Sequence, residues 1–179
     1  MIFAGALLVF GALLVKAAHK DEPLRVVPAV DLDKYAGLWY EVARLPNRFE
    51  EKCTGEVTAN YERIEDGRLK VVNSCRKSDG KMTKAEGVAR LADKNGPNSR
   101  LEVRFAPSFL SFLPFVWGDY QIIELAEDYS YAVVGSPDRK YLWILSRTAQ
   151  IDEDTYGRLT QAAAAQGFDV SKLIRTKQS

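Results

Sequence analysis

Residues 38–45 read LWYEVARL and residues 140–148 read KYLWILSRT, and between them short apolar segments alternate with turn residues. Alternating β-branched and aromatic residues are typical of strands, and the Asp66-Gly67 and Asp79-Gly80 pairs predict hairpin turns. The pattern predicts strands over residues 38–45, 54–64, 68–75, 81–91, 99–106, 119–126, 129–135 and 140–148. Eight strands at this regular spacing favour an up-and-down barrel or a sandwich.

A single helix is predicted after the last of these strands. Residues 151–154 read IDED, and acidic residues in a first turn suit the positive end of a helix dipole. The run QAAAAQ at 161–166 has high helix propensity, and the helix is predicted to end at Gly167. Residues 168–176 then form a short ninth strand in this interpretation. A chain of 179 residues is long enough for one domain with a complete core.

The N-terminal residues 2–15 are apolar without interruption. As a helix they would be about 21 Å long, which is short of the roughly 30 Å hydrocarbon core of a bilayer. The length matches the apolar region of a signal peptide, and Val15-Lys16-Ala17 offers a small-residue cleavage pattern, although no basic residue follows Met1. We expect residues 1–17 to be a signal peptide or membrane anchor, 18–29 an extension, and 30–179 the folded domain. A buried N-terminal core helix is the alternative.

Composition excludes several classes of function. Lys and Arg number 25 against 24 for Asp and Glu, so the chain lacks the basic excess that nucleic-acid binding requires, and no nucleic-acid partner is expected. The single histidine, His19, lies beside the apolar N-terminal run, which argues against a histidine-dependent catalytic site or a zinc site. We therefore expect neither metal nor cofactor. Cys53 and Cys75 fit a disulfide in an oxidising compartment, with two separate buried thiols as the alternative.

Three motifs together resemble a known family. Gly37 and Trp39 form a G-x-W-Y sequence with Tyr40, Gly118-Asp119-Tyr120 opens a later strand, and Trp143 and Arg147 lie in YLWILSRT. Their order and spacing resemble the conserved regions of the lipocalins, and WYEVARLPNRFE resembles the bacterial outer-membrane, apolipoprotein D-like group. The resemblance covers about residues 30–177. It implies an all-β fold with one C-terminal helix: an eight-stranded antiparallel up-and-down barrel enclosing a ligand cavity.

The resemblance assigns structural roles to three residues. Gly37 allows tight chain entry, Trp39 closes one end of the barrel, and Arg147 lies over the Trp39 ring in a cation–π contact. Strand alternation then predicts which side chains face the interior. If Trp39 faces inward, Glu41 and Ala43 do too, and Trp143 lies about 13 Å from Arg147, midway along the barrel.

Six interior positions are candidate ligand contacts: Trp143, Tyr120, Phe105, Glu41, Val103 and Ile122. A wall of aromatic and aliphatic side chains with few polar groups suits a hydrophobic molecule with one polar head. The alternative for each aromatic is ordinary core packing. A carboxylate facing an apolar interior is costly unless paired or protonated, so Glu41 either pairs with a basic side chain, receives a ligand head group, or lies outside.

Residues 105–117 read FAPSFLSFLPFVW and join two strands at the expected open end. An exposed loop this apolar indicates a membrane or partner contact, and one folded inward would be a lid or wall. Plain packing is the third alternative. The candidate docking residues are Phe109, Leu110, Phe112, Leu113 and Phe115.

The leading functional hypothesis is a non-enzymatic protein that binds, stores or transports a fatty acid or lysophospholipid in the periplasm or at the outer membrane. A docking module that uses the 105–117 loop is one alternative, with contact at the outer-membrane surface. A lipid-modifying enzyme that uses a free cysteine or Glu41 is another, and a disulfide would remove the thiol. Oligomeric state is open, and a homodimer is among the expectations.

Overall fold

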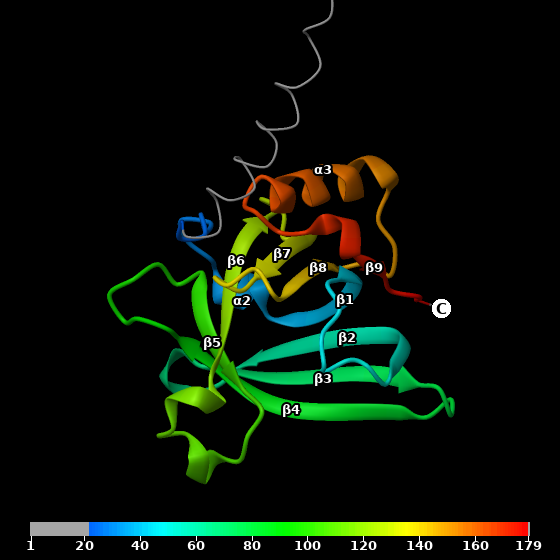
Figure 1. The fold of residues 1–179 in the computed structure, drawn as a ribbon. Helices are drawn as coiled ribbons and strands as arrows, with labels where there is room; N and C mark the ends of the chain where they lie inside the picture. Colours follow the sequence, from blue (N-terminus) through cyan, green and yellow to red (C-terminus); the bar gives the residue numbers. More distant parts are fainter. Residues whose placement is uncertain (1–21, 179) are drawn as a thin grey trace, which may run out of the picture.

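The computed structural model describes residues 22–178, and the predicted signal or anchor segment 1–17 lies outside them. The described residues form eight long strands in one antiparallel sheet that closes on itself (Figure 1). The ends of all eight lie within two residues of the predicted ends. The strands are β1 (Gly37–Arg44), β2 (Cys53–Arg63), β3 (Leu69–Lys77), β4 (Met82–Leu91), β5 (Arg100–Arg104), β6 (Gly118–Leu125), β7 (Tyr131–Gly135) and β8 (Leu142–Ser146).

Strand β1 closes the ring because it pairs with a neighbour on each side. Trp39 lies opposite Ala59 of β2, and Glu41 lies opposite Leu145 of β8. Every other neighbour among these eight strands is also next in sequence, which makes the topology up-and-down. The barrel prediction is therefore confirmed, and the sandwich alternative is wrong. Closure pairs the strands at both sides of the sheet, so no long edge is left open.

The interior of the barrel holds the larger of two apolar cores. Its side chains alternate with outward-facing residues along each strand, as a two-residue period requires. Trp39, Tyr35 and Ile122 are fully buried in it. The other buried members contributed by the strands are Ala59, Tyr61, Leu69, Val71, Ala89, Leu101, Tyr120, Ala132, Val134 and Leu145.

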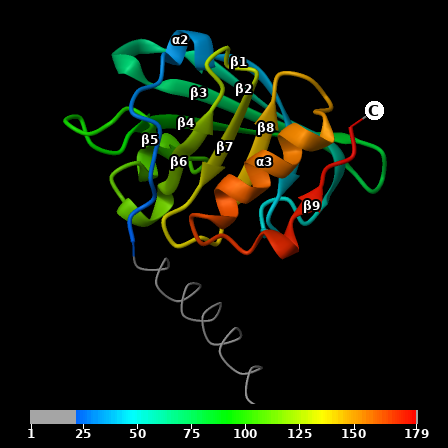
Figure 2. The same ribbon diagram turned by 90° about the horizontal axis from the view of Figure 1, so that it is seen from above.

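Helix α3 (Glu153–Ala164) forms the second core against the outside of the barrel. The Asp152 side chain caps it by accepting a hydrogen bond from Thr155 N, which satisfies one free amide of the first turn. Leu159 and Ala163 are buried in a cluster with the outward side chains of β6–β8. Figure 2 shows the helix lying across these strands.

The C-terminal segment fills the gap where β1 and β2 diverge. After a 3₁₀ turn (Val170–Lys172), the two-residue strand β9 (Ile174–Arg175) pairs with the end of β1. Lys177 O then accepts from Glu56 N at 2.7 Å, and Gln178 Nε2 donates to Glu41 O and Val57 O at 2.8 and 2.9 Å. The ninth strand is thus shorter than predicted, and it holds the sheet together at one end of the barrel.

The turn of the β2–β3 hairpin differs from the two-residue turn that an Asp-Gly pair favours. A two-residue turn at Asp66-Gly67 would place Cys75 opposite Thr58, but a short 3₁₀ turn (Glu65–Gly67) places Ser74 there instead. Two irregularities between Cys53 and Thr58 then shift the register again. They bring Cys53 within 5.6 Å of Cys75 between Cα atoms, so the disulfide joins β2 to β3.

The disulfide prediction is confirmed, since Cys53 and Cys75 are bonded and no other cysteine occurs in the sequence.

Within residues 22–178, no helix combines the length and apolar character needed to cross a bilayer. The same residues contain no cluster of His, Cys, Asp and Glu suited to a metal ion.

Candidate ligand-binding site

One end of the barrel is closed by Trp39 and Arg147. The guanidinium carbon of Arg147 lies 3.9 Å from the centroid of the Trp39 ring. Its nitrogens also donate to backbone oxygens of the short helix α2 (Leu32–Tyr35) and the residues after it, at 2.6 Å to Lys34 and 2.9 Å to Ala36. Gly37 has φ +97°, and a Cβ there would lie 3.3 Å from Arg147 Nη1, so a side chain would strain the backbone and crowd this contact.

Tyr120 belongs to a buried trio of phenols above this floor. Its hydroxyl lies 2.7 Å from that of Tyr35 and 2.8 Å from that of Tyr61. Burial raises the pKa of Tyr61 to about 12 and the pKa values of Tyr35 and Tyr120 well above their ordinary value of 10. The three hydroxyls therefore stay neutral and satisfy one another. Tyr120 therefore lies near the closed end of the barrel, next to the floor.

The middle of the interior is apolar. Ile122 is 0% exposed, and Val103 is partly buried against the same cluster. Further along the barrel the register places Asn73 of β3 between Ala59 and Ala85, which puts its side chain on the inner face. Its Oδ1 atom is buried and has no hydrogen-bond partner among the described residues. Ala85 faces the same way yet is exposed, so the interior opens toward solvent at this level.

A polar network lies at this open end. A bulge between Glu41 and Ala43 reverses the alternation of β1. Glu41 lies opposite the inward-facing Leu145, whereas Ala43 packs in the outer core against α3. The expectation that Ala43 faces inward is wrong because one extra residue turns the next side chain to the other face.

Arg44 takes the inward position that the bulge creates. Its Nη1 lies 2.9 Å from Glu41 Oε1, and its Nε lies 3.0 Å from Glu50 Oε2. Glu41 also accepts a hydrogen bond from the Thr176 hydroxyl. Of the alternatives for Glu41, the structure shows pairing with a base. Burial is the main cause that raises the pKa of Glu41 to about 8, and the Glu50 carboxylate adds to it.

Trp143 lies at the mouth and not midway along the barrel. It is opposite Arg44, the last residue of β1, and its Nε1 donates to Glu50 Oε1 at 2.9 Å. Its ring stacks on Tyr141, with centroids 5.9 Å apart and planes 7° from parallel. The distance estimate from Arg147 overlooked the bulge and the short length of β8. Arg44, Glu50 and Asn73 were not predicted from the sequence as residues of the site. Of these three, only Asn73 could have been found from the sequence, because it continues the inward-facing alternation from Val71.

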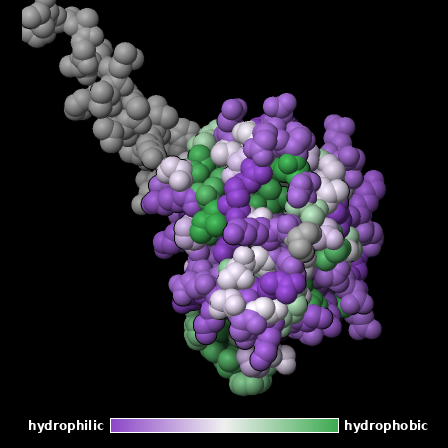
Figure 3. Space-filling view, turned by 90° about the vertical axis from the view of Figure 1, so that its right-hand side faces the viewer, coloured by the Kyte–Doolittle hydropathy of each residue, from purple (hydrophilic) through white to green (hydrophobic). Residues whose placement is uncertain are grey.

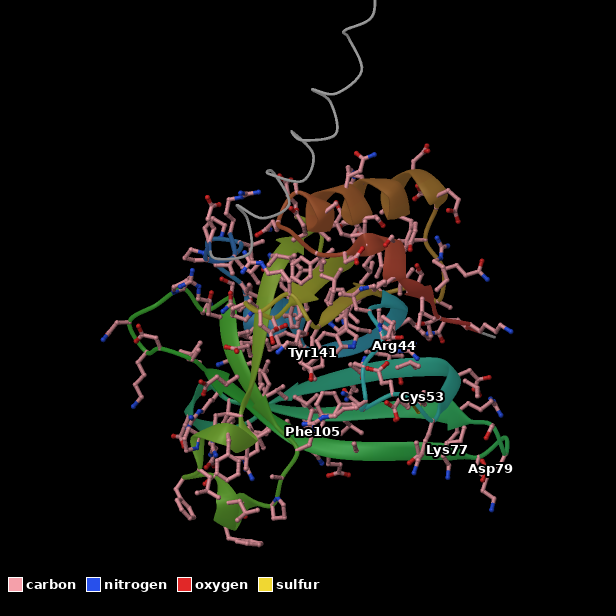
Figure 4. The ribbon with its side chains drawn as sticks, viewed as in Figure 1. Arg44, Cys53, Lys77, Asp79, Phe105 and Tyr141 are labelled. Carbon is pink, nitrogen blue, oxygen red and sulfur yellow. A yellow bond between two sulfur atoms is a disulfide. The ribbon has the colours of Figure 1, made fainter. Side chains whose placement is uncertain are left out.

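Phe105 stands on the wall of the mouth, beyond the end of β5. A Cβ on Gly87 would lie 2.8 Å from Phe105 Cδ1 and 2.6 Å from Arg104 O, so only glycine leaves room for the ring. Phe105 is 42% exposed. Figure 4 labels Phe105 at the end of β5, with Arg44 and Tyr141 on the β1 and β8 side.

The rest of the 105–117 loop projects from the barrel through two 3₁₀ turns, Ser108–Leu110 and Pro114–Val116. Phe109, Phe112 and Phe115 are 73%, 77% and 80% exposed, whereas Leu110 and Leu113 are partly buried. Figure 3 shows apolar surface gathered at the lower end of the molecule, where the loop lies in Figure 1. These three rings are not folded over the interior as a lid.

The floor, the wall and the mouth together define the class of protein. It is a closed antiparallel barrel that is sealed at one end and open at the other. The lipocalin-like domain model matches residues 30–178, and the chain therefore belongs to the lipocalin family. It is 42% identical over 161 residues to temperature-induced lipocalin-1 of Arabidopsis thaliana, covering 89% of this chain and 86% of that protein.

Two further relatives agree with this assignment. Outer membrane lipoprotein Blc of Escherichia coli is 38% identical over 171 residues, covering 93% of this chain and 92% of that protein. Apolipoprotein D of Mus musculus is 32% identical over 158 residues, covering 83% and 77%. Insecticyanin of the tobacco hornworm has the same fold, with a TM-score of 0.67 at 21% identity over 88% of this chain and 86% of that chain.

Proposed function

We propose that this protein binds, stores or transports a fatty acid or lysophospholipid, with the acyl chain in the barrel and the polar head at the mouth. The observation that carries the proposal is the gradient along the interior. Aromatic and aliphatic side chains line the sealed end, and Asn73, Glu41, Arg44 and Glu50 lie at the open end. An amphiphile with one polar head matches such a gradient.

The candidate contacts divide by depth in this proposal. Val103 and Ile122 contact the acyl chain, and Tyr120 supports its far end from the floor. Trp143 and Phe105 flank the chain near the mouth, where each keeps a partly exposed ring. Asn73 offers an unused acceptor on the way. Glu41 acts indirectly, by holding Arg44.

The proposed location is the bacterial cell envelope, in the periplasm or at the outer membrane. Outer membrane lipoprotein Blc, a relative over nearly the whole chain, is named for that membrane. A disulfide is typical of an oxidising compartment. Because both cysteines are bonded to each other, neither is free to carry a lipid.

The test is native mass spectrometry of residues 18–179, purified without detergent, with lipid identification after denaturation. Both apolar cores and the complete strand ring lie within this stretch, so it contains what the fold needs. We expect a stoichiometric fatty acid or lysophospholipid, or saturable binding of one when the protein is titrated. An empty protein that neither lipid binds would overturn the proposal.

A second candidate function is docking through the loop, because three phenylalanine rings in one short segment are largely exposed. We favour a membrane surface, with a second copy of the chain as the other outcome. Deleting residues 108–115 should abolish vesicle association while leaving ligand binding intact. If the deletion variant still associates with vesicles, the loop is not the docking surface. If, in the absence of vesicles, the deletion converts a dimer into a monomer, the loop mediates self-association instead.

The thiol route to a lipid-modifying enzyme is closed in this structure, because Cys53 and Cys75 are bonded to each other. Glu41 is buried against Arg44 and Thr176, so it has no free approach to a substrate. We therefore propose binding without chemistry on the ligand.

A further inference from the structure

A groove of about 250 Å³ lies on the outer face of the barrel, next to the start of the apolar loop. The groove side chains of Lys70, Val88 and Arg104 lie on the outer face, because they alternate along their strands with the inward-facing Val71, Ala89 and Val103. Val88 lies opposite Lys70 on β3 and Arg104 on β5, so the three form one row across the strands. The groove is lined by Ile64, Lys70, Glu86, Gly87, Val88, Arg104 and Ala106.

Arg104 is the unusual member of this groove. It is 7% exposed, yet no carboxylate within residues 22–178 forms an ion pair with it. Its Nη1 donates to the nearby Ala106 carbonyl oxygen, and its Nε is buried without a hydrogen-bond partner. A buried cation normally has a counter-ion, because removing its charge from water is costly. Arg104 therefore lacks the anion that its position calls for.

The neighbouring charges are already matched, which leaves a surplus of one positive charge in the groove. Lys70 Nζ lies 3.4 Å from Glu86 Oε2, and Arg90 Nη2 lies 3.0 Å from Glu102 Oε2. Adjacent strands are about 4.8 Å apart, so Lys70 and Arg104 start about 10 Å apart and their long side chains can both reach one ligand above Val88. A guanidinium and an ammonium at that spacing suit a phosphate.

The groove is physically joined to the apolar loop through Trp117. The guanidinium carbons of Arg90 and Arg104 lie 3.8 and 5.2 Å from the centroid of its ring. Its Nε1 donates to Ser111 O in the loop at 2.8 Å, which fixes the loop relative to the groove. A bilayer that accepts Phe109, Phe112 and Phe115 would thus bring its head groups to the level of Arg104.

We propose that this groove binds the phosphate of an anionic phospholipid at a membrane surface, with Arg104 as the main contact and Lys70 as the second. The inference rests on docking through the loop and adds a head-group preference to it. The rings give affinity for any bilayer, and Arg104 gives the preference for an anionic one. Ile64, Val88 and Ala106 supply the apolar rim on which the glycerol portion rests.

The test measures binding of residues 18–179 to vesicles of phosphatidylcholine alone and of phosphatidylcholine mixed with phosphatidylglycerol, with the full chain in parallel. We expect the wild type to prefer the anionic vesicles. R104Q should reduce that preference about fivefold, the effect of one basic residue at an anionic surface. It should weaken phosphatidylcholine binding less, because the choline ammonium already neutralises that lipid's phosphate. R104K should restore part of the anionic preference. R158Q, on helix α3 across the barrel, is the matched control.

Two further variants separate the outcomes. E86Q should strengthen the anionic preference, because it releases Lys70; this result does not depend on R104Q folding. Replacing Phe109, Phe112 and Phe115 with Ser should remove binding to both vesicles, which tests docking by itself. If the wild type binds both kinds of vesicle equally, or if R104Q keeps the same anionic preference as R158Q, the head-group site is wrong and membrane docking through the loop still stands. If inorganic phosphate quenches Trp117 fluorescence through Arg104 and displaces the protein from vesicles, the groove is a free-phosphate site and the lipid assignment is wrong.

Discussion

Glu41 Oε1 and Arg44 Nη1 lie 2.9 Å apart, three residues apart on β1, with both side chains buried at the mouth of the barrel. An unbroken strand would place these residues on opposite faces, and the bulge after Glu41 puts them on the same one. The Thr176 hydroxyl donates to the same carboxylate, so this pair also holds the C-terminal segment. The mouth of the barrel is thus organised around one buried acid.

Stability should fall as pH rises from about 4.5 to 8. Burial raises the pKa of Glu41 in the folded state to about 8 from an ordinary value of 4.5, so within this window the folded protein binds more protons than the unfolded chain. The slope is at most about 1.4 kcal/mol per pH unit. E41Q should flatten the profile when unfolding is measured in urea at several pH values. E153Q, which changes an exposed ion pair with Arg175, is the control, and an unchanged slope in E41Q would contradict the prediction.

Trp39→Ala should destabilise the protein by about 3–5 kcal/mol, as large-to-small changes in a core do. The indole is 0% exposed, stacks under Arg147 and donates from Nε1 to Tyr35 O at 2.8 Å. Urea denaturation followed by far-UV circular dichroism measures the loss. A loss below about 1 kcal/mol would show that the floor does not depend on this ring.

Trp143→Leu should weaken ligand binding more than it weakens the fold. Less apolar contact at the mouth reduces binding by about 1–2 kcal/mol, or about five- to thirtyfold in Kd. The lost hydrogen bond to Glu50 lowers the free energy of unfolding by about 1 kcal/mol or less. Fluorescent fatty-acid displacement and urea melts measure the two effects. Trp117→Leu, outside the barrel, should leave the Kd unchanged, and equal losses in Trp143→Leu would make that residue a core residue.

Tyr120→Phe removes the hydroxyl that links Tyr35 and Tyr61. Two buried phenols then lose their shared partner, and we expect a loss of about 1–3 kcal/mol in unfolding free energy. Tyr129→Phe loses one exposed bond to Asp31 N and should cost less. Thermal melts of both variants give the comparison. A larger change in ligand Kd than in stability would mean that Tyr120 contacts the ligand directly.

Most of the secondary structure could be predicted from hydrophobic periodicity and turn residues. The strands predicted from alternating apolar and polar residues agree with the structure. Each strand needs one apolar face toward the core, and this requirement does not depend on which strands lie beside it. The Asp152 cap and the acidic first turn likewise place α3 from local chemistry alone. The spacing of the motifs indicated the family because Gly37 and Trp39 lie in the first predicted strand and Arg147 lies in the last of the eight.

The sequence by itself determined the positions of the strands and the helix, because these depend on local patterns and on which residue types are present. Closure of the strands into a barrel and the bond between Cys53 and Cys75 were decided by the tertiary structure. The tertiary structure decided which side chains meet at the mouth. A bulge of one residue turned Ala43 outward and Arg44 inward, and Glu50 from the following loop and Thr176 from the distant C-terminal segment then completed the network. Only the packed barrel left Arg104 buried without a counter-ion, because burial depends on every neighbouring strand and loop at once.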